Sequence, residues 1–236
     1  MPSSTFDSLT MIIEICANSR QSAVNALAGG AMRIELCRQL ELGGTTPTED
    51  DIRFCVHELK LRTHVLVRPR AGDFVYTDAE FEQICREVEM CRRCGAHAVV
   101  VGFLTPNGCI DEERTHQLVR LASPMEVTFH RAFDEMRQDS LEALEAVIRC
   151  GCHRLLTSGC QPNAEEGIPI LRQLVSQAAG RITILAGAGI TPTNARRIVQ
   201  ETGVTEIHGS CKHTLPDGTI ETDTQIVEQL IKSISL

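Results

Sequence analysis

Residues 33–37 read Arg-Ile-Glu-Leu-Cys, and residues 12–16 read Ile-Ile-Glu-Ile-Cys. In both segments, aliphatic side chains alternate with a carboxylate and a thiol. Because alternate residues of a strand face opposite sides of a sheet, this pattern predicts two strands, each with one apolar and one polar face. In a parallel sheet the apolar face is the one that helices cover. We therefore expect the glutamate and the cysteine of each segment to point into the interior of the fold.

Six further aliphatic runs continue this pattern, and amphipathic stretches separate them. The runs cover residues 64–68, 98–102, 127–130, 154–157, 182–186 and 206–208. The stretches between them carry helix-start signals, such as the capping box Thr77-Asp78-Ala79-Glu80. Eight strand–helix units without a break predict a closed (β/α)8 barrel, the TIM barrel. The structural alternative is an open, doubly wound sheet.

Length and composition fit one such barrel. The chain has 236 residues, of which 42% are hydrophobic and 23% are charged, and no linker or low-complexity tract divides it. We expect a single domain over residues 11–236, preceded by a disordered lead-in at residues 1–10. The net charge of −8 argues against a nucleic-acid or anionic-membrane surface. No apolar run approaches the roughly 20 residues of a membrane span.

The cysteines indicate the compartment. There are eleven, an odd number, and residues 1–10 lack the basic start and apolar segment of a signal peptide. We therefore expect reduced thiols in the cytoplasm rather than a disulfide scaffold. The lysines are Lys60, Lys212 and Lys232, and because only Lys212 lies near an expected strand end, the sequence disfavours Schiff-base chemistry.

The alternation places an unusual set of polar side chains inside the barrel, where Val, Ile and Leu are the usual occupants. The residues with inward parity are Glu14, Cys16, Glu35, Cys37, Arg68, Thr128, His130, Glu206 and His208. Each uncompensated buried charge would cost several kcal/mol, so these groups must pair with one another or bind a ligand.

Two interpretations of this interior stay open. One is a structural ion network in which Glu14 or Glu35 pairs with Arg68. The other is a functional site. Because Glu35, Arg68 and His130 lie nearest the carboxyl ends of their strands, we favour a functional role for these three.

Glycine-bearing loops follow the last two strands. Gly187-Ala188-Gly189-Ile190 comes after strand seven, and Gly209-Ser210 comes after strand eight. In many barrels the backbone N–H groups of these two loops hold a phosphate. Gly187, Gly189, Gly209 and Ser210 are therefore expected to form an anion site, unless the loops are simply tight turns.

Cys16 and Cys37 stand apart from the other cysteines because they end neighbouring strands with the same inward parity. Two soft thiolates suit Cu(I) better than a hard cation. The alternative is a packed pair of buried thiols without a ligand. The Cys91-x-x-Cys94 pair has no second pair to complete a zinc site.

Several longer motifs span nearly the whole predicted barrel: Ile34-Glu35-Leu36-Cys37 with Gly43-Gly44-Thr45-Thr46-Pro47, Val67-Arg68-Pro69-Arg70-Ala71-Gly72-Asp73-Phe74, Thr128-Phe129-His130-Arg131-Ala132-Phe133-Asp134, Leu156-Thr157-Ser158-Gly159-Cys160, and Glu206-Ile207-His208. In these motifs the sequence resembles the CutC family of copper homeostasis proteins. The sequence departs from the family at Ala186-Gly187-Ala188-Gly189, where glycines are commoner.

The resemblance implies a cytoplasmic, homo-oligomeric barrel involved in copper tolerance or trafficking. Cys16 and Cys37 match the two strand-end cysteines proposed as copper ligands in that family. Copper is then the expected cargo of the pair. From the residues themselves, Cys211 and His208 are outside candidates for a third ligand.

A second hypothesis is a barrel enzyme that acts on a small anionic substrate, a phosphorylated one included. Arg68 and Arg70 would hold the negative group, and Glu35 and His130 would act as general base and acid. Glu35 could do so near neutral pH only if burial or a partner raises its pKa. A scaffold without chemistry is the third hypothesis, and it leaves the charges inside the barrel unexplained.

Overall fold

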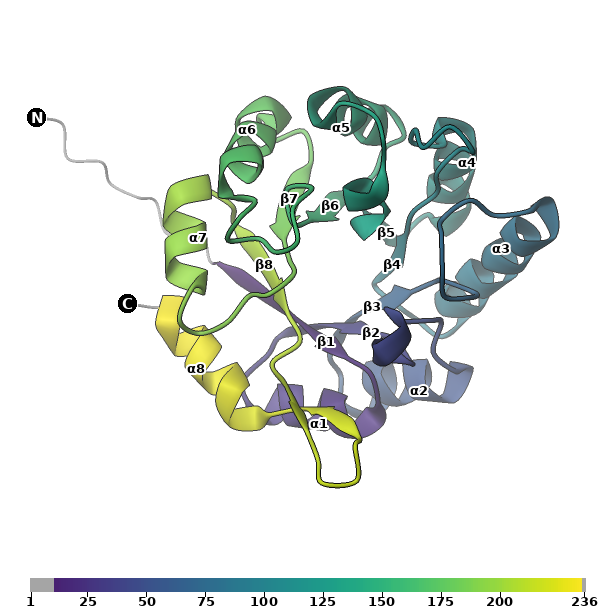
Figure 1. Cartoon of the computed structure of the whole chain (residues 1–236). Helices are drawn as coiled ribbons and strands as arrows, with labels where there is room; N and C mark the ends of the chain where they lie inside the picture. Colours follow the sequence, from purple (N-terminus) through teal and green to yellow (C-terminus); the bar gives the residue numbers. More distant parts are fainter. Residues whose placement is uncertain (1–10, 235–236) are drawn as a thin grey trace, which may run out of the picture.

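The computed structural model describes residues 11–234, so the expected lead-in at residues 1–10 lies outside the described residues. Strands β1 to β8 form a closed parallel barrel in chain order, which confirms the predicted TIM fold. Figure 1 shows the helices as an outer ring around these strands. The strands are β1 Ile12–Ala17, β2 Arg33–Leu36, β3 Arg62–Leu66, β4 Ala98–Val101, β5 Glu126–Phe129, β6 Arg154–Thr157, β7 Thr183–Ala186 and β8 Glu206–Gly209.

The α-helices follow the strands in regular alternation. They are α1 Arg20–Ala28, α2 Glu49–Arg53, α3 Asp78–Arg93, α4 Glu112–Ala122, α5 Ser140–Arg149, α6 Ile168–Ala178, α7 Ala195–Thr202 and α8 Thr224–Ile234. Helix α2 continues into a π-helical turn at Phe54–Glu58, and 3-10 helices occupy Leu40–Leu42 and Arg131–Glu135. The capping box predicted before α3 is present, since Thr77 and Glu80 exchange hydrogen bonds. No helix within residues 11–234 is long and apolar enough to cross a membrane.

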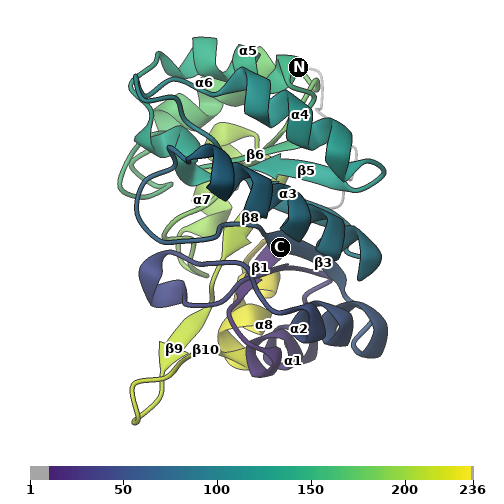
Figure 2. The ribbon, with the colours of Figure 1, turned by 90° about the vertical axis from the view of Figure 1, so that its right-hand side faces the viewer.

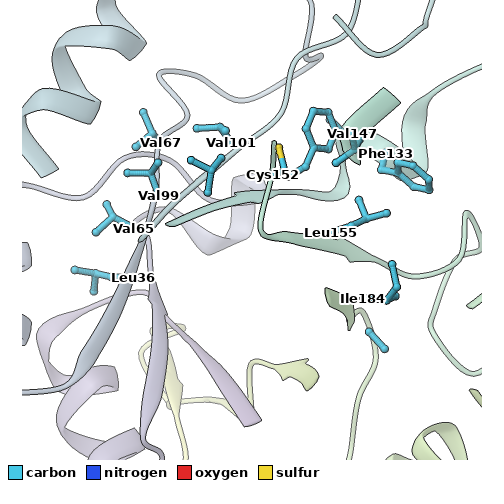
Figure 3. Close-up of a cluster of buried hydrophobic side chains, with 14 of the residues drawn as sticks. Leu36, Val65, Val67, Val99, Val101, Phe133, Val147, Cys152, Leu155 and Ile184 are labelled. Carbon is cyan, nitrogen blue, oxygen red and sulfur yellow. The ribbon is translucent and has the colours of Figure 1, made fainter. Parts of the chain in front are cut away.

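The hydrophobic core lies between the outer face of the strands and the helices. Figure 3 shows part of it, with Leu36, Val65 and Val99 from three neighbouring strands and Val147 from α5. All four are fully buried. Because the aliphatic members of each strand are used in this layer, the polar members are left to fill the inside of the barrel.

Four strands, β2, β3, β4 and β5, end one or two residues earlier than the sequence predicts. Cys37, Arg68 and His130 lie one or two residues beyond β2, β3 and β5, at the start of the loops. They are nevertheless buried, with no more than 6% of each residue exposed. The loops therefore hold these side chains over the carboxyl-terminal mouth of the barrel instead of inside its wall.

A hairpin that the sequence analysis did not predict follows β8. Strands β9 Lys212–Thr214 and β10 Ile220–Thr222 pair antiparallel, and Figure 2 shows the hairpin projecting from the body of the barrel. Its base is fastened to the first helical unit, because Asn18 donates to the Ile220 carbonyl and Asn25 to the Thr222 carbonyl, each at 2.9 Å.

Candidate functional site

A cavity of about 890 Å³ opens at the carboxyl ends of the strands. Glu35, Arg68, His130 and His208 line it, as their alternation predicts, and Glu14 is buried beneath it. Cys16 and Cys37 also line the cavity. The barrel mouth therefore combines thiols, carboxylates, imidazoles and a guanidinium in one enclosed space.

The two strand-end cysteines are brought together as the sequence predicts. Their sulfur atoms lie 3.8 Å apart, and both residues are buried. Gly44 makes room beside them, because a Cβ there would lie 2.6 Å from Leu66 Cδ2 and 3.5 Å from Cys37 Cβ, at a φ of +88°. The hydrogen bond with Cys37 and burial raise the pKa of the Cys16 thiol well above its ordinary value. At neutral pH Cys16 is therefore a thiol.

His208 lies beside this pair and links it to two carboxylates. Its Nδ1 is 2.9 Å from Glu14 Oε1, and its Nε2 is 3.5 Å from Glu35 Oε2. Burial opposes the charged imidazole, but Glu35, a hydrogen bond with Cys16, and Glu14 together hold the pKa of His208 well above its ordinary value. Burial, partly offset by His208, raises the pKa of Glu35. This is the direction that base chemistry near neutral pH would require.

Within residues 11–234, Cys16, Glu35 and His208 also form a group that could hold a metal ion, with their ligand atoms within 4.8 Å of one another. His208 is therefore better placed as a third ligand than Cys211, which lines the cavity outside this group. A sulfur, an imidazole nitrogen and a carboxylate oxygen are available at one point, with the second sulfur adjacent.

A buried ion network lies below the cavity. Arg33 contacts Glu14 at 2.8 Å and Glu206 at 2.5 Å, and Arg154 contacts the same Glu206 oxygen at 3.0 Å. His64 Nδ1 lies 2.9 Å from Glu14. Burial would raise the pKa of Glu14, but His64, His208 and Arg33 hold it well below its usual range. Glu14 is thus a carboxylate that orients His208 from below.

The suggestion that Arg68 neutralises Glu14 or Glu35 is therefore wrong. The Arg68 guanidinium donates to the backbone carbonyls of Leu42, Gly44 and Gly72, and within residues 11–234 it makes no ion pair. Arg68 lies two residues beyond β3, and its loop turns the guanidinium towards these carbonyls. Arg33 and Arg154, at the amino-terminal ends of β2 and β6, take that role.

Arg70 and Gly187 do not join the cavity. The Arg70 side chain turns away to Glu80 and Asp73, at 2.5 and 3.0 Å, and so forms no clamp with Arg68. The Gly187 N–H donates to the Thr157 carbonyl at 3.0 Å, which removes it as an anion donor. The remaining members of the expected anion site, Gly189, Gly209 and Ser210, do line the cavity.

His130 is held as a neutral imidazole. Its Nδ1 accepts the backbone N–H of Ala132 at 3.1 Å, which leaves the ring proton on Nε2. Burial and the nearby charge of Arg68 lower the pKa of His130 to about 3. At neutral pH His130 can therefore donate a hydrogen bond from Nε2, but it does not supply an imidazolium proton.

This depressed pKa predicts a loss of stability in acid. Above the ordinary histidine value of 6.5 neither state is protonated, whereas between 6.5 and about 3 only the unfolded chain binds the proton at His130. The free energy of unfolding should therefore fall as the pH drops through this range, by at most about 1.4 kcal/mol per pH unit. Urea unfolding at pH 7 and pH 5 should show a smaller loss for His130→Phe than for the parent. Equal losses would contradict the assignment.

These features define a (β/α)8 barrel protein with a thiol- and carboxylate-lined cavity at its mouth. Comparison with known proteins makes the assignment specific. The model of the CutC family matches residues 11–213. A CutC family protein of Bacteroides fragilis is 46% identical over 208 residues, which cover 88% of this chain and 82% of that protein. The chain belongs to the CutC family.

Two further relatives agree. The mouse copper homeostasis protein cutC homolog is 44% identical over 207 residues, covering 88% of this chain and 76% of that protein. A crystal structure of CutC from Streptococcus agalactiae superposes with a TM-score of 0.81 at 32% identity, over 85% of this chain and 99% of that one. The barrel and its family membership are thus supported by sequence and structure together.

Proposed function

We propose that the protein binds Cu(I) as cargo through Cys16 and Cys37 and serves copper homeostasis. The observation that carries the proposal is the sulfur–sulfur separation of 3.8 Å at the barrel mouth, where two thiolates can share one soft ion. We choose copper as the metal because the mouse relative is named a copper homeostasis protein.

The donor set fits this cargo. Two sulfurs and the His208 imidazole are ligands that Cu(I) accepts. His208 would have to give up its proton to become a ligand, since only the neutral imidazole coordinates a metal. Glu14, below it, would then keep the ring oriented, as outer-shell carboxylates do for metal-bound histidines.

The decisive experiment is an anaerobic Cu(I) titration against a chromogenic chelator, with proton release recorded in parallel. We expect one ion per chain and net release of protons, because Cys16 must ionise from a raised pKa. The affinity should rise with pH by about tenfold per unit for each proton released. Two results would overturn the proposal: a Cu(I) affinity that is independent of pH, or tighter binding of Zn²⁺ than of Cu(I) at the same site.

The setting of this function is a further part of the proposal. All eleven cysteines are free thiols, which suits the reducing cytoplasm. The homo-oligomer expected from the family resemblance stays a prediction. Light scattering of the purified protein would test it.

A further inference from the structure

We infer that Arg68 and His130 form a second binding subsite, for the carboxylate of a small organic acid, on the wall of the same cavity. This inference goes beyond copper binding and does not depend on it, because neither residue belongs to the thiol cluster. Its starting point is a pair of hydrogen-bond donors that have no partner in the part of the chain that the structure describes.

The first donor is Arg68 Nε. The residue is 6% exposed and lines the cavity, yet its Nε meets neither solvent nor an acceptor within residues 11–234. The two terminal nitrogens are committed to backbone carbonyls. Those carbonyls are neutral, and so is the nearby Tyr76 phenol, because burial raises its pKa. Within residues 11–234, the guanidinium charge is therefore buried without an ion-pair partner, which is costly unless an anion joins it.

The second donor is His130 Nε2. The residue is 5% exposed and lines the cavity. None of the described residues accepts a hydrogen bond from its Nε2. The bond from Ala132 to Nδ1 keeps the proton on Nε2. The fold makes room for the ring here, since a Cβ on Gly102 would lie 2.4 Å from His130 Nδ1. His130 is thus a rigid, neutral N–H donor.

Phe74 joins the two donors into one site. Its ring centroid lies 4.9 Å from that of His130, and the Arg68 guanidinium carbon lies 4.9 Å from the Phe74 centroid. Because both N–H groups are shielded from solvent and Phe74 contacts both side chains, we expect its ring to shift when a ligand enters.

The number of free donors identifies the ligand class. One guanidinium N–H and one neutral imidazole N–H, with a single positive charge between them, match the two oxygens and single charge of a carboxylate. A phosphate dianion brings more charge and more acceptors than this pair can satisfy.

The test is an NMR titration of the metal-free protein with pyruvate, following its labelled carboxylate and the His130 Nε2 proton. We expect saturation in the parent. Arg68→Met should bind roughly ten- to a hundredfold more weakly, because a charge-assisted bond is lost, and His130→Phe about fivefold more weakly. Arg131→Met is the matched control. Its guanidinium also lines the mouth but is 44% exposed and paired with Asp134, so the affinity should change less than about twofold.

Several results would overturn the subsite. The first is a titration of the parent that does not saturate by about 50 mM pyruvate. The second is an equal affinity for pyruvate in the parent, Arg68→Met and His130→Phe. The third is saturation of the parent by inorganic phosphate when pyruvate does not bind. Should Arg68→Met fail to fold, because Arg68 ties together several loop carbonyls, His130→Phe decides alone. The Cys16→Ser, Cys37→Ser variant should bind pyruvate like the parent, which separates this outcome from that of the copper proposal.

Discussion

Replacing both mouth cysteines, in the variant Cys16→Ser, Cys37→Ser, should abolish tight binding of Cu(I) while leaving the barrel folded. Serine keeps nearly the size of cysteine but offers a hard oxygen in place of a soft sulfur. Losing an outer-shell partner alone costs a metal site roughly 10- to 100-fold in affinity, and losing two direct ligands should exceed that range. Competition with a Cu(I) chelator measures the affinity, and circular dichroism checks the fold.

The matched control removes thiols that lie away from the cavity. Cys109 is exposed and Cys85 is partly exposed, so the variant Cys85→Ser, Cys109→Ser should retain the affinity of the parent. If the control loses the ion, or if the mouth variant keeps it, copper binds to accessible thiols and the assignment to Cys16 and Cys37 is wrong.

Arg33→Met should be the most destabilising single change in the barrel interior. Arg33 is 1% exposed and is the cation between Glu14 and Glu206. Methionine fills part of the volume but leaves two buried carboxylates facing each other, and breaking a buried pair in this way costs about 3–5 kcal/mol. Urea unfolding at pH 7 would measure the loss.

Two comparisons sharpen this measurement. Arg62→Met breaks a contact with Glu126 at 2.8 Å, but the Arg62 side chain is 46% exposed, so the cost should stay below about 1 kcal/mol. Adding Glu206→Gln to Arg33→Met should restore part of the lost stability, because it removes the repulsion between Glu14 and Glu206 that Arg33 no longer offsets. A cost for Arg33→Met no larger than that of Arg62→Met would refute the network.

Much of this interior follows from the two-residue period of the strands. Glu14, Glu35 and His208 were placed inside the barrel by that period, and the structure holds them there. The same period also points to Arg33 and His64, which share the parity of Glu35 and Arg68 but are not among the residues predicted above to face inward. Reading the alternation from the first residue of each strand would have found the ion network.

Other features do not follow from local pattern. Arg70 follows Arg68 by two residues in one motif. At this point the chain has left β3, and the Arg70 side chain donates a hydrogen bond to Glu80 instead of facing the cavity. The β9–β10 hairpin has short polar strands and is held by long-range contacts from Asn18 and Asn25. Such contacts depend on which helices meet in space, and the period of a strand carries no information about them.

The seam between β1 and β8 affects the order in which the site can be made. Cys16 is on β1, but His208 reaches it only when β8 pairs with β1 along Glu14↔His208. On the ribosome, both thiols emerge long before the strand that encloses them. A nascent chain thus carries two neighbouring cysteines open to oxidation and to any passing ion. If the pair binds Cu(I) as we propose, the ion should load only after β8 has paired with β1, and until then the two thiols must stay reduced.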